Sequence, residues 1–533
     1  MRKMKKVFSL IMAVSLLAAT MGCKKEEETS QTVENFTFGT DELEFSWYDN
    51  SDTAAATLWA DSSMIEKWIL ENKKVKIKYM DPGGASAEKL ATMIVSDKFP
   101  DVITMLKGQD SEKLISSKKV IPLNEYFEKY PNIYNALSEK GILQMMTYKD
   151  GKNYEIPNWA NITDMPTGNN AWVLNKKVYE ELGSPKLEDF DDLYNYLKMV
   201  KEKYPDMIPY ETTDSFQGER YVLAGMAENL PPDHLDFYSY VSEDGKLKSI
   251  FEHPAYRETA QYLNKLYREE LMTRDVFSQT ADQVKEKFSN GRVAVTSTAI
   301  GVCENTRKDM QNLGSDWITI TPVKKDGLDR EKVYSQGYNI LGWTEVLISK
   351  DAKNPEGIYA FLDWLFSPEG QRLYMYGPPG YYYDEVTSEG YPILNEKWFE
   401  STEPMKDVKG NGASIGLGNS FIDKCGIYVD ENSPEEFRSW GKQQQLKNIW
   451  PYAKDITEFS DVIPGVGVEE GIIYQTIMDL HKKARAEYIY ADSPEKVDAI
   501  IDTLIQDTRD ADIEKLLQYE EKVWNENKVK LSK

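Results

Sequence analysis

The first part of the chain alternates segments of strand-like and helix-like hydrophobic periodicity. Apolar residues dominate 43–47 and 101–105, and they alternate with polar residues over 75–80, so these three segments predict β-strands. Apolar side chains recur at helical spacing over 55–71, and 87–96 also favours a helix. Strands and helices in regular alternation indicate a parallel α/β sheet with helices on its faces.

The pattern stays mixed through the middle of the chain and becomes helical at the end. Further strands are predicted at 171–174 and 292–296. Helices are predicted at 176–182, 187–203, 254–270, 281–288, 354–365, 469–490, 494–506 and 511–527. No internal repeat appears, and a chain of this length is too long for one core, so we expect two or more lobes.

The N-terminus has the pattern of an export signal. A basic patch precedes the apolar run Val7–Met21, which is too short to span a bilayer comfortably. The run ends in Gly22 and Cys23, and this ending resembles the lipobox of bacterial lipoproteins, although Thr20 stands where leucine is usual. The resemblance implies that Cys23 becomes the lipidated first residue. The alternative is an ordinary secretory signal with an incidental cysteine.

The predicted signal peptide therefore covers 1–22, and a lipidated stalk follows over 23–40. The stalk is polar and poor in apolar residues, as flexible linkers are. No other segment is long and apolar enough to cross a membrane, so we expect a body held at the extracellular face of the cell membrane by its lipid anchor.

The charge balance is strongly acidic. The chain has 64 lysine and arginine residues against 88 aspartate and glutamate residues, a net charge of −24. Loss of residues 1–22, which carry four basic and no acidic side chains, would make it −28. Nucleic acids and anionic membrane surfaces attract basic patches, so this balance argues against both as partners. Solubility alone also explains it.

Motifs for catalysis or metal binding are missing from the sequence. There are three histidines and three cysteines, without His-x-x-x-His or Cys-x-x-Cys spacing. Neither a phosphate-binding loop nor a Gly-x-Ser-x-Gly nucleophile motif occurs. Beyond Cys23, the remaining Cys303 and Cys425 are compatible with one disulfide or with two free thiols. We therefore predict no enzyme activity and no cofactor.

Aromatic residues beside turns are the most informative candidates for binding. Aromatic side chains make up 12% of the chain, and several stand at strand ends or in loops, where the cleft of an α/β protein is lined. Flat rings cover the apolar faces of sugars, and amides pair with hydroxyl groups. The candidate stacking residues and polar partners are Trp47, Tyr48, Asn50, Asn158, Trp159, Asn161, Trp343 and Tyr381. Each is also compatible with a purely structural role.

Five stretches of the chain are similar to the family-1 extracellular solute-binding lipoproteins of ABC importers, in their large Gram-positive form. The stretches are SDKFPDVITM at 96–105, DGKNYEIPNW at 150–159, and the longer segments 172–201, 251–277 and 354–383. Some positions depart from the family pattern; for example, the sequence at 377–380 is Gly-Pro-Pro-Gly where family members usually have Gly-x-Glu-Gly before the tyrosine. Many relatives also have a calcium loop that 201–211 lacks, so we expect no calcium there.

The resemblance implies an α/β fold of two lobes, the periplasmic-binding-protein-like class II type, with about three interlobe crossings and extra C-terminal helices. The crossings are expected at 157–163, 289–296 and 343–350. We accordingly assign 41–160 and 292–345 to a first lobe, and 161–291 and 346–533 to a second.

The resemblance also implies a function. The chain is expected to capture an oligosaccharide between its lobes and deliver it, as a monomer, to the permease subunits of an ABC importer. A peptide or another polar metabolite is the alternative ligand. A surface glycoside hydrolase is a further alternative, for which the sequence offers no motif.

Overall fold

The structure is a computed structural model, and the residues it describes are 36–50, 63–80, 82–213, 216, 218–401, 403–409, 416–465 and 467–532. The chain divides into two units, Met1–Phe36 and Thr37–Lys533, and every helix and strand named below lies in the second. The signal peptide, Cys23 and most of the predicted stalk fall outside the described residues, so those predictions stay predictions.

Lobe 1 is built on a five-stranded sheet with the strand order β2-β1-β3-β12-β4. β1 pairs in parallel with both β2 and β3, whereas β12 runs antiparallel to its neighbours β3 and β4. The strands are β1 (Leu43–Asp49), β2 (Val75–Met80), β3 (Val102–Leu106), β4 (Glu155–Asn158) and β12 (Thr344–Ile348).

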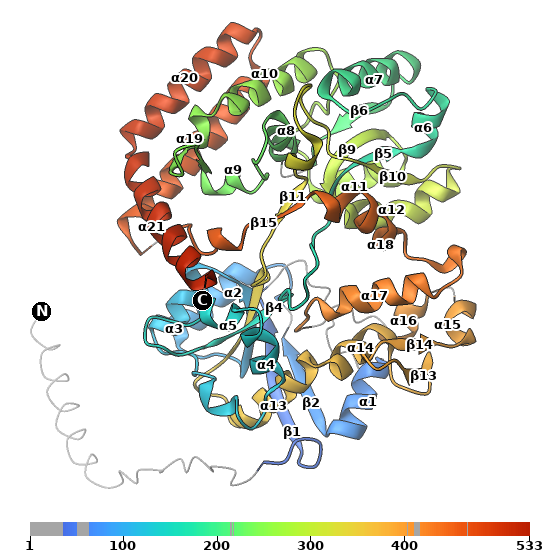
Figure 1. The fold of residues 1–533 in the computed structure, drawn as a ribbon, viewed down its shortest axis with the longest axis vertical. Helices are drawn as coiled ribbons and strands as arrows, with labels where there is room; N and C mark the ends of the chain where they lie inside the picture. The colour runs from blue at the N-terminus through green and yellow to red at the C-terminus, as the bar shows by residue number, and fades with distance from the viewer. Residues whose placement is uncertain are drawn as a thin grey trace, which may run out of the picture. The chain divides into compact units, whose positions relative to one another are not determined.

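Helices cover both faces of the lobe 1 sheet (Figure 1). The helix α13 contacts β1 and β12 and carries a continuous run of buried residues, including Phe361 and Leu362. Tyr48, Ile103 and Leu347 of the sheet form a separate buried cluster with side chains of α2 and α3. The helices of this lobe are α1 (Met64–Lys73), α2 (Ser86–Ser96), α3 (Gln109–Ser116), α4 (Asn132–Ser138), α5 (Ile142–Met145), α13 (Pro355–Phe366), α14 (Pro368–Tyr376), α15 (Glu396–Glu400), α16 (Pro404–Lys409) and α17 (Phe421–Glu431).

Lobe 2 is built on a four-stranded sheet with the order β10-β5-β9-β6. β5 runs antiparallel to both β10 and β9, and β6 pairs in parallel with β9. The strands are β5 (Asn170–Asn175), β6 (Ile208–Glu211), β9 (Val293–Ala299) and β10 (Trp317–Ile320). Three two-stranded pairs complete the strands: β7 (Ser239–Val241) with β8 (Leu247–Ser249), β13 (Tyr383–Val386) with β14 (Pro392–Leu394), and β11 (Gln336–Tyr338) with β15 (Ala453–Asp455).

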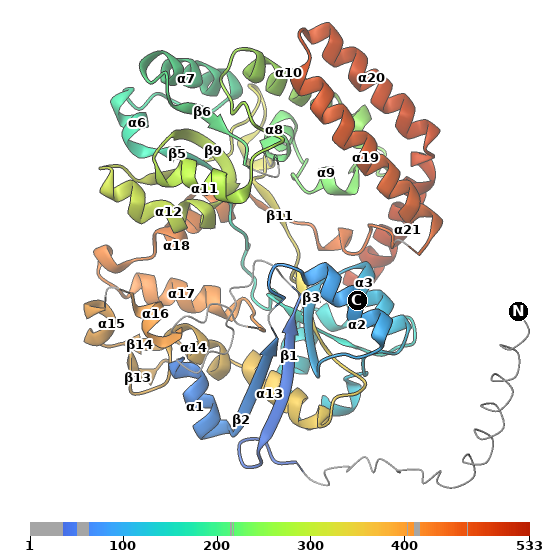
Figure 2. The same cartoon turned by 180° about the vertical axis from the view of Figure 1, so that it is seen from behind.

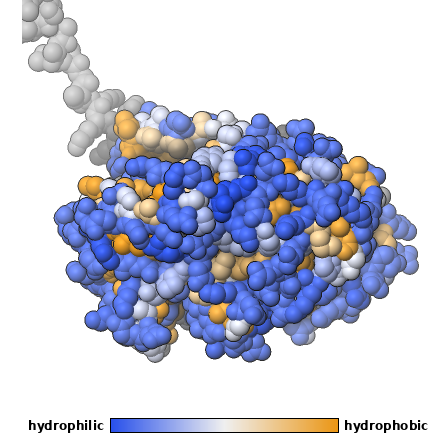
Figure 3. Space-filling view, turned by 90° about the horizontal axis from the view of Figure 1, so that it is seen from above, coloured by the Kyte–Doolittle hydropathy of each residue, from blue (hydrophilic) through white to orange (hydrophobic). Residues whose placement is uncertain are grey.

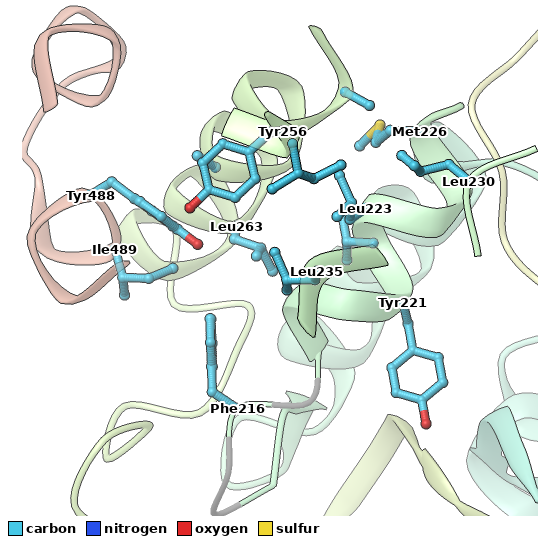
Figure 4. Close-up of a cluster of buried hydrophobic side chains, with 14 of the residues drawn as sticks. Phe216, Tyr221, Leu223, Met226, Leu230, Leu235, Tyr256, Leu263, Tyr488 and Ile489 are labelled. Atoms are coloured by element: carbon cyan, nitrogen blue, oxygen red, sulfur yellow. The ribbon is translucent and has the colours of Figure 1, made fainter. Parts of the chain in front are cut away.

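The largest hydrophobic core lies in lobe 2 and includes side chains of the C-terminal helices. Figure 4 shows Tyr256 and Leu263 of α10 near Leu223 of α8 and near Tyr488 and Ile489 of α19. The helices of this lobe are α6 (Lys176–Glu181), α7 (Phe190–Lys203), α8 (Gly218–Met226), α9 (His234–Phe237), α10 (Pro254–Arg268), α11 (Ala281–Ser289), α12 (Ile300–Asn312), α18 (Trp440–Gln444), α19 (Glu469–Tyr490), α20 (Pro494–Asp510) and α21 (Ile513–Leu531).

Local sequence explains where many helices begin. Asp189, Thr280 and Ser493 precede their helices in extended conformation, and each side chain accepts a hydrogen bond from a backbone N–H in the first turn. Such caps satisfy donors that lack a partner inside the helix and contribute about 1 kcal/mol each. Proline at the first helical position favours the start of α10, α13 and α20 differently, because it has no N–H that needs a partner and its φ is already helical.

The sheet pairing differs from the division of lobes predicted from the sequence. β9 and β10 lie in 292–345, which is predicted to belong to lobe 1, yet both pair with β5 in the lobe 2 sheet. β12 and the helices α13 and α14 belong to lobe 1. The fold class itself, two α/β lobes with additional C-terminal helices, is confirmed.

The chain passes between the lobes three times (Figures 1 and 2). The first passage is 159–169, between β4 and β5, and it overlaps the predicted 157–163. The second is 321–343, between β10 and β12, and the third is 432–439, between α17 and α18. The predicted crossings at 289–296 and 343–350 are wrong. The first segment joins α11 to β9 within lobe 2, and the second consists almost entirely of β12 in the lobe 1 sheet.

Cys303 and Cys425 are buried and free, and they lie in different hydrophobic clusters, so they do not pair. Within the described ranges, no helix combines the length and the apolar character needed to cross a membrane. Hydrophilic residues dominate the face shown in Figure 3, with apolar residues in small groups, which is consistent with the strongly acidic composition.

Candidate ligand-binding site

The lobe 1 sheet brings several strand ends to one edge, which we call the lobe 1 edge. β1, β3 and β4 run in the same direction and end there, and the antiparallel β12 begins there. In the register, Thr344 lies opposite both Leu106 at the end of β3 and Asn158 at the end of β4. Ligands of open α/β sheets bind outside the carboxyl ends of parallel strands.

Large apolar side chains are exposed at this edge. Trp343, just before β12, is 59% exposed, and Leu106 is 61% exposed. A backbone hydrogen bond from Lys107 to the Trp343 carbonyl joins their two strands, and the half-buried Trp159 follows β4 directly. Exposed apolar side chains that gather beside polar strand ends mark this edge as a candidate binding surface.

The backbone around Trp159 is held in an unusual conformation. Trp159 has φ +64°, in the left-handed region that non-glycine residues seldom adopt. Its N–H donates to the Gly418 carbonyl at 2.7 Å, and the side-chain oxygen of Asn158 accepts from the Gly418 N–H at 2.6 Å. The segment around Gly418 therefore holds the backbone of Trp159 at the start of the first crossing, and strained backbone of this kind gathers at functional sites.

Two of the predicted polar partners serve the local structure. Asn158 contributes its side-chain oxygen to the Gly418 contact. Asn161 donates to the Met165 carbonyl, and its side-chain oxygen accepts from the backbone and hydroxyl of Thr163. Asn50 stands directly after β1 at the lobe 1 edge, where its backbone N–H donates to the Thr104 carbonyl.

The other predicted aromatic residues are not exposed at the lobe 1 edge. The Trp47 and Tyr48 side chains are completely buried, and the Trp47 indole N–H donates to the Thr104 hydroxyl at 2.9 Å. Tyr48 donates to the Asn50 side chain. Tyr381 lies between α14 and β13, where its ring packs on Tyr382 at a centroid distance of 4.5 Å. These three rings pack against protein atoms in this structure.

Asp49 is a buried carboxylic acid at the lobe 1 edge that the sequence analysis missed. It is the last residue of β1, and its neighbour in the register is Thr104 of β3. Burial raises the pKa of its carboxyl group to about 6, because the charged form loses water that neighbouring groups do not replace. Residues that end a strand at a ligand edge and have a shifted pKa are candidates for binding.

Replacement of Asp49 by asparagine should stabilise the protein at neutral pH. The pKa of Asp49 is raised in the folded state, so the native protein loses stability as the pH rises from about 4 through about 6. Asp49→Asn removes that loss and should increase the free energy of unfolding at pH 7.5 by up to about 3 kcal/mol. Urea unfolding at pH 4 and pH 7.5 measures the effect. A difference between the two proteins that does not grow with pH would contradict this assignment.

The two longer crossings are joined to each other by Gln336, which the sequence analysis also missed. The Gln336 side chain is buried, accepts from the Asn170 N–H at 2.9 Å, and donates to the carbonyl of Thr167. A further backbone bond links Asn161 to the Ile340 carbonyl at 2.8 Å. The crossings thus form a connected hinge beside Trp159, which places the aromatic surface next to the point about which lobes of such proteins move.

The histidines have structural contacts. The His234 ring lies 2.8 Å from the Ser239 carbonyl, His253 caps α10, and His481 pairs with the buried Glu219 at 3.0 Å. The part of the chain that the structure describes holds no group of three or more histidine, cysteine, aspartate or glutamate side chains suited to a metal ion.

A sequence model of the bacterial extracellular solute-binding proteins matches residues 60–372, which is more than half of the chain. The chain belongs to this family. Among curated proteins, this solute-binding protein is 20% identical over 438 residues to the polygalacturonan/rhamnogalacturonan-binding protein YtcQ of Bacillus subtilis, covering 79% of this chain and 82% of YtcQ. It is 21% identical to the lipoprotein LipO of the same organism, covering 81% of this chain and 82% of LipO.

Solved structures share the fold of this solute-binding protein. The Streptococcus pneumoniae ABC-transporter substrate-binding protein FusA, in complex with kestose, superimposes with a TM-score of 0.67 at 17% identity and covers 91% of this chain and 99% of FusA. The alginate-binding protein AlgQ2 without calcium ion gives a TM-score of 0.66 at 18% identity, covering 92% of this chain and all of AlgQ2. At these identities the likeness establishes the two-lobe fold alone.

Proposed function

We propose that this protein captures a soluble oligosaccharide at the lobe 1 edge, encloses it between its lobes, and delivers it to the permease of an ABC importer. The observation that carries the proposal is the exposed Trp343, with Leu106 and Trp159 beside it, at the edge of the lobe 1 sheet where β1, β3 and β4 end. Aromatic rings stack on the apolar faces of sugars, while Asp49 and Asn50 supply polar groups for hydroxyl donors at the same edge.

Ligand binding would select the closed arrangement of the two lobes. A sugar that contacts both lobes binds the closed form more tightly than the open one, and this difference in affinity shifts the population toward the closed form. Gln336 joins the two longer crossings, so we expect them to bend together when the lobes close. Kestose on FusA and the polygalacturonan and rhamnogalacturonan named for YtcQ support a carbohydrate as the ligand class.

In the cell, we propose, Cys23 carries the lipid anchor and the protein acts as a monomer at the extracellular face of the membrane. We also propose that it performs no chemistry on its ligand. The structural contacts of His234, His253 and His481 support this last point, because they leave these rings engaged within the protein. Neutral sugars released from an incubated oligosaccharide would contradict it.

A thermal-shift screen with purified protein tests the ligand class. An oligosaccharide at about one hundred times its dissociation constant should raise the free energy of unfolding by about 2.7 kcal/mol. The panel contains fructans, oligogalacturonides, N-glycan fragments and peptides of similar size. Stabilisation by peptides and by none of the glycans would replace the oligosaccharide with a peptide as the ligand.

A further inference from the structure

Asp49 lies on the face of the lobe 1 sheet that α13 covers. Successive side chains of a strand point to opposite faces, so Asp49 shares its face with Phe45, whose ring packs on Phe361 of α13 at a centroid distance of 5.8 Å. In the register Asp49 lies opposite Thr104 of β3. Leu106, two residues further along that face of β3, is 61% exposed. The face is therefore open to solvent at the lobe 1 edge, where β1 and β3 end.

The Asp49 carboxyl group at this edge is a hydrogen-bond acceptor without a donor. Its side chain is 8% exposed. It has no hydrogen-bond or ion-pair partner in the described part of the chain, yet its oxygens are not fully enclosed by protein atoms. A carboxylate that has lost most of its water is stabilised by a ligand that donates hydrogen bonds to it. A sugar offers such donors in its hydroxyl groups.

In the described part of the chain, the elements that pack around Asp49 bring no other charged group beside it. Thr104 of β3, Met80 at the end of β2 and the segment 416–420 are uncharged. The acidic side chains of α13 are hydrogen-bonded to other partners. Burial therefore acts alone on Asp49 and raises its pKa to about 6. The protonation state of this group depends on what binds beside it.

The lysines beside this end of the lobe 1 sheet lie on its other face. Lys107, Lys149 and Lys530 line a cavity of about 290 Å³ beside α3, where the Lys107 ammonium lies 4.0 Å from Glu155. Sugar carboxylates are recognised in proteins by arginine and lysine, whose N–H groups match them. The α13 face offers Asp49 instead. A uronate bound there would bring two negative charges together, which is unfavourable unless one of them takes up a proton.

We propose that Asp49 selects an uncharged sugar residue at the lobe 1 edge, whose hydroxyl groups donate to the Asp49 carboxylate, and that it excludes uronates from this position. The inference rests on the proposed oligosaccharide function and adds the charge of the ligand to it. Because hydroxyl donors favour the ionised carboxylate, capture of the sugar at mildly acidic pH also releases a proton. Discrimination thus comes from repulsion of the wrong ligand as well as from contacts with the right one.

Calorimetric titrations of the protein without its signal peptide at pH 7.5 test the selectivity. The probes are trigalacturonate, its fully methyl-esterified form, which has the same skeleton without charge, and the neutral fructans and N-glycan fragments of the screen. We expect an uncharged probe to bind most tightly and trigalacturonate to bind at least about tenfold more weakly than that probe, because two carboxylates would share one partly dehydrated site. Trigalacturonate that binds as tightly as the best uncharged probe would overturn the inference while the proposed function stands. Binding of no glycan at all would overturn the proposed function itself.

Asp49→Asn locates the selectivity, because it keeps the size of the side chain and removes its charge. With the tightest uncharged probe, the affinity of the unmodified protein should fall about 10- to 30-fold from pH 7.5 to pH 4.5, since Asp49 has a pKa of about 6 in the free protein and must give up its proton before it accepts hydroxyl donors. The affinity of Asp49→Asn should change by less than about twofold over this range, and this variant should bind trigalacturonate more tightly than the unmodified protein does. A purely structural role of Asp49 would not move the pH profile.

Asp351→Asn is the matched control. Asp351 is an exposed acid just beyond β12, at the opposite edge of the same sheet, so solvent and salt screen its charge from the site. This variant should keep both the pH dependence and the selectivity of the unmodified protein. An Asp49→Asn protein with the same pH dependence as Asp351→Asn would refute the role of Asp49 even if uncharged glycans bind best.

Discussion

Trp343→Ala should weaken oligosaccharide binding by about 10- to 150-fold, because covering one aromatic ring with ligand is worth roughly 1.5–3 kcal/mol. The effect on folding should be small, since Trp343 is 59% exposed and contributes little buried surface to the native protein. Isothermal titration calorimetry with the best glycan from the screen gives the affinity, and a thermal melt of the free protein gives the stability.

Tyr134→Ala provides the comparison for this variant. Tyr134 is an exposed aromatic residue of the same lobe, on α4, and it lies outside the lobe 1 edge. The Tyr134→Ala protein should bind the glycan with unchanged affinity. If Trp343→Ala binds as tightly as Tyr134→Ala, the lobe 1 edge is not the stacking surface and the proposed site must move.

Gly342→Ala should destabilise the protein by about 2–6 kcal/mol, through two effects that add. Gly342 has φ +72°, where a side chain is strained by about 1–3 kcal/mol. A β-carbon there would also lie 2.1 Å from the Asn158 carbonyl oxygen, and this backbone cannot move without disturbing the first crossing; such overpacking costs about 1–3 kcal/mol more. Denaturant unfolding followed by circular dichroism measures the loss.

Two other glycines separate these effects. Gly327 also has positive φ, at +82°, but a β-carbon there would meet no atom within 4 Å, so Gly327→Ala reports the backbone strain alone. Gly301 is inside α12 with ordinary φ and open space, so Gly301→Ala should stabilise the protein by about 0.5–1 kcal/mol. A Gly342→Ala protein no less stable than Gly327→Ala would show that the two crossings are not tightly packed at this point.

Most elements that hydrophobic periodicity predicts coincide with a described element to within a few residues, because the local sequence of these elements contains both the period and the end signals. The strand at 75–80 and the helix at 469–490 have the predicted bounds. The helix predicted at 187–203 begins instead at Phe190, since Asp189 caps it. The sheet to which a strand belongs is not a local property, and for this reason the prediction places β9 and β10 in the wrong lobe.

The candidate site is predictable only where its residues have a local sequence signal. Trp159 and Trp343 stand beside turn residues in the sequence, and the register places both at the lobe 1 edge. Trp47 also stands beside turn residues, yet its ring packs against Gly416. A β-carbon added to Gly416 would lie 2.4 Å from the Trp47 ring. A contact between residues this distant in sequence has no signal in either segment. Gln336 escapes prediction likewise, because its partners lie in another crossing.

The position of β12 has a consequence for how the nascent polypeptide matures. β12 fills the gap between β3 and β4, yet it is synthesised only after residues 159–343. Until then β3 and β4 present open hydrogen-bonding edges, which are prone to pair with other chains. All four strands of the lobe 2 sheet are synthesised before β12. Lobe 2 can therefore assemble its sheet first, and the incomplete lobe 1 sheet must be protected from aggregation during that time.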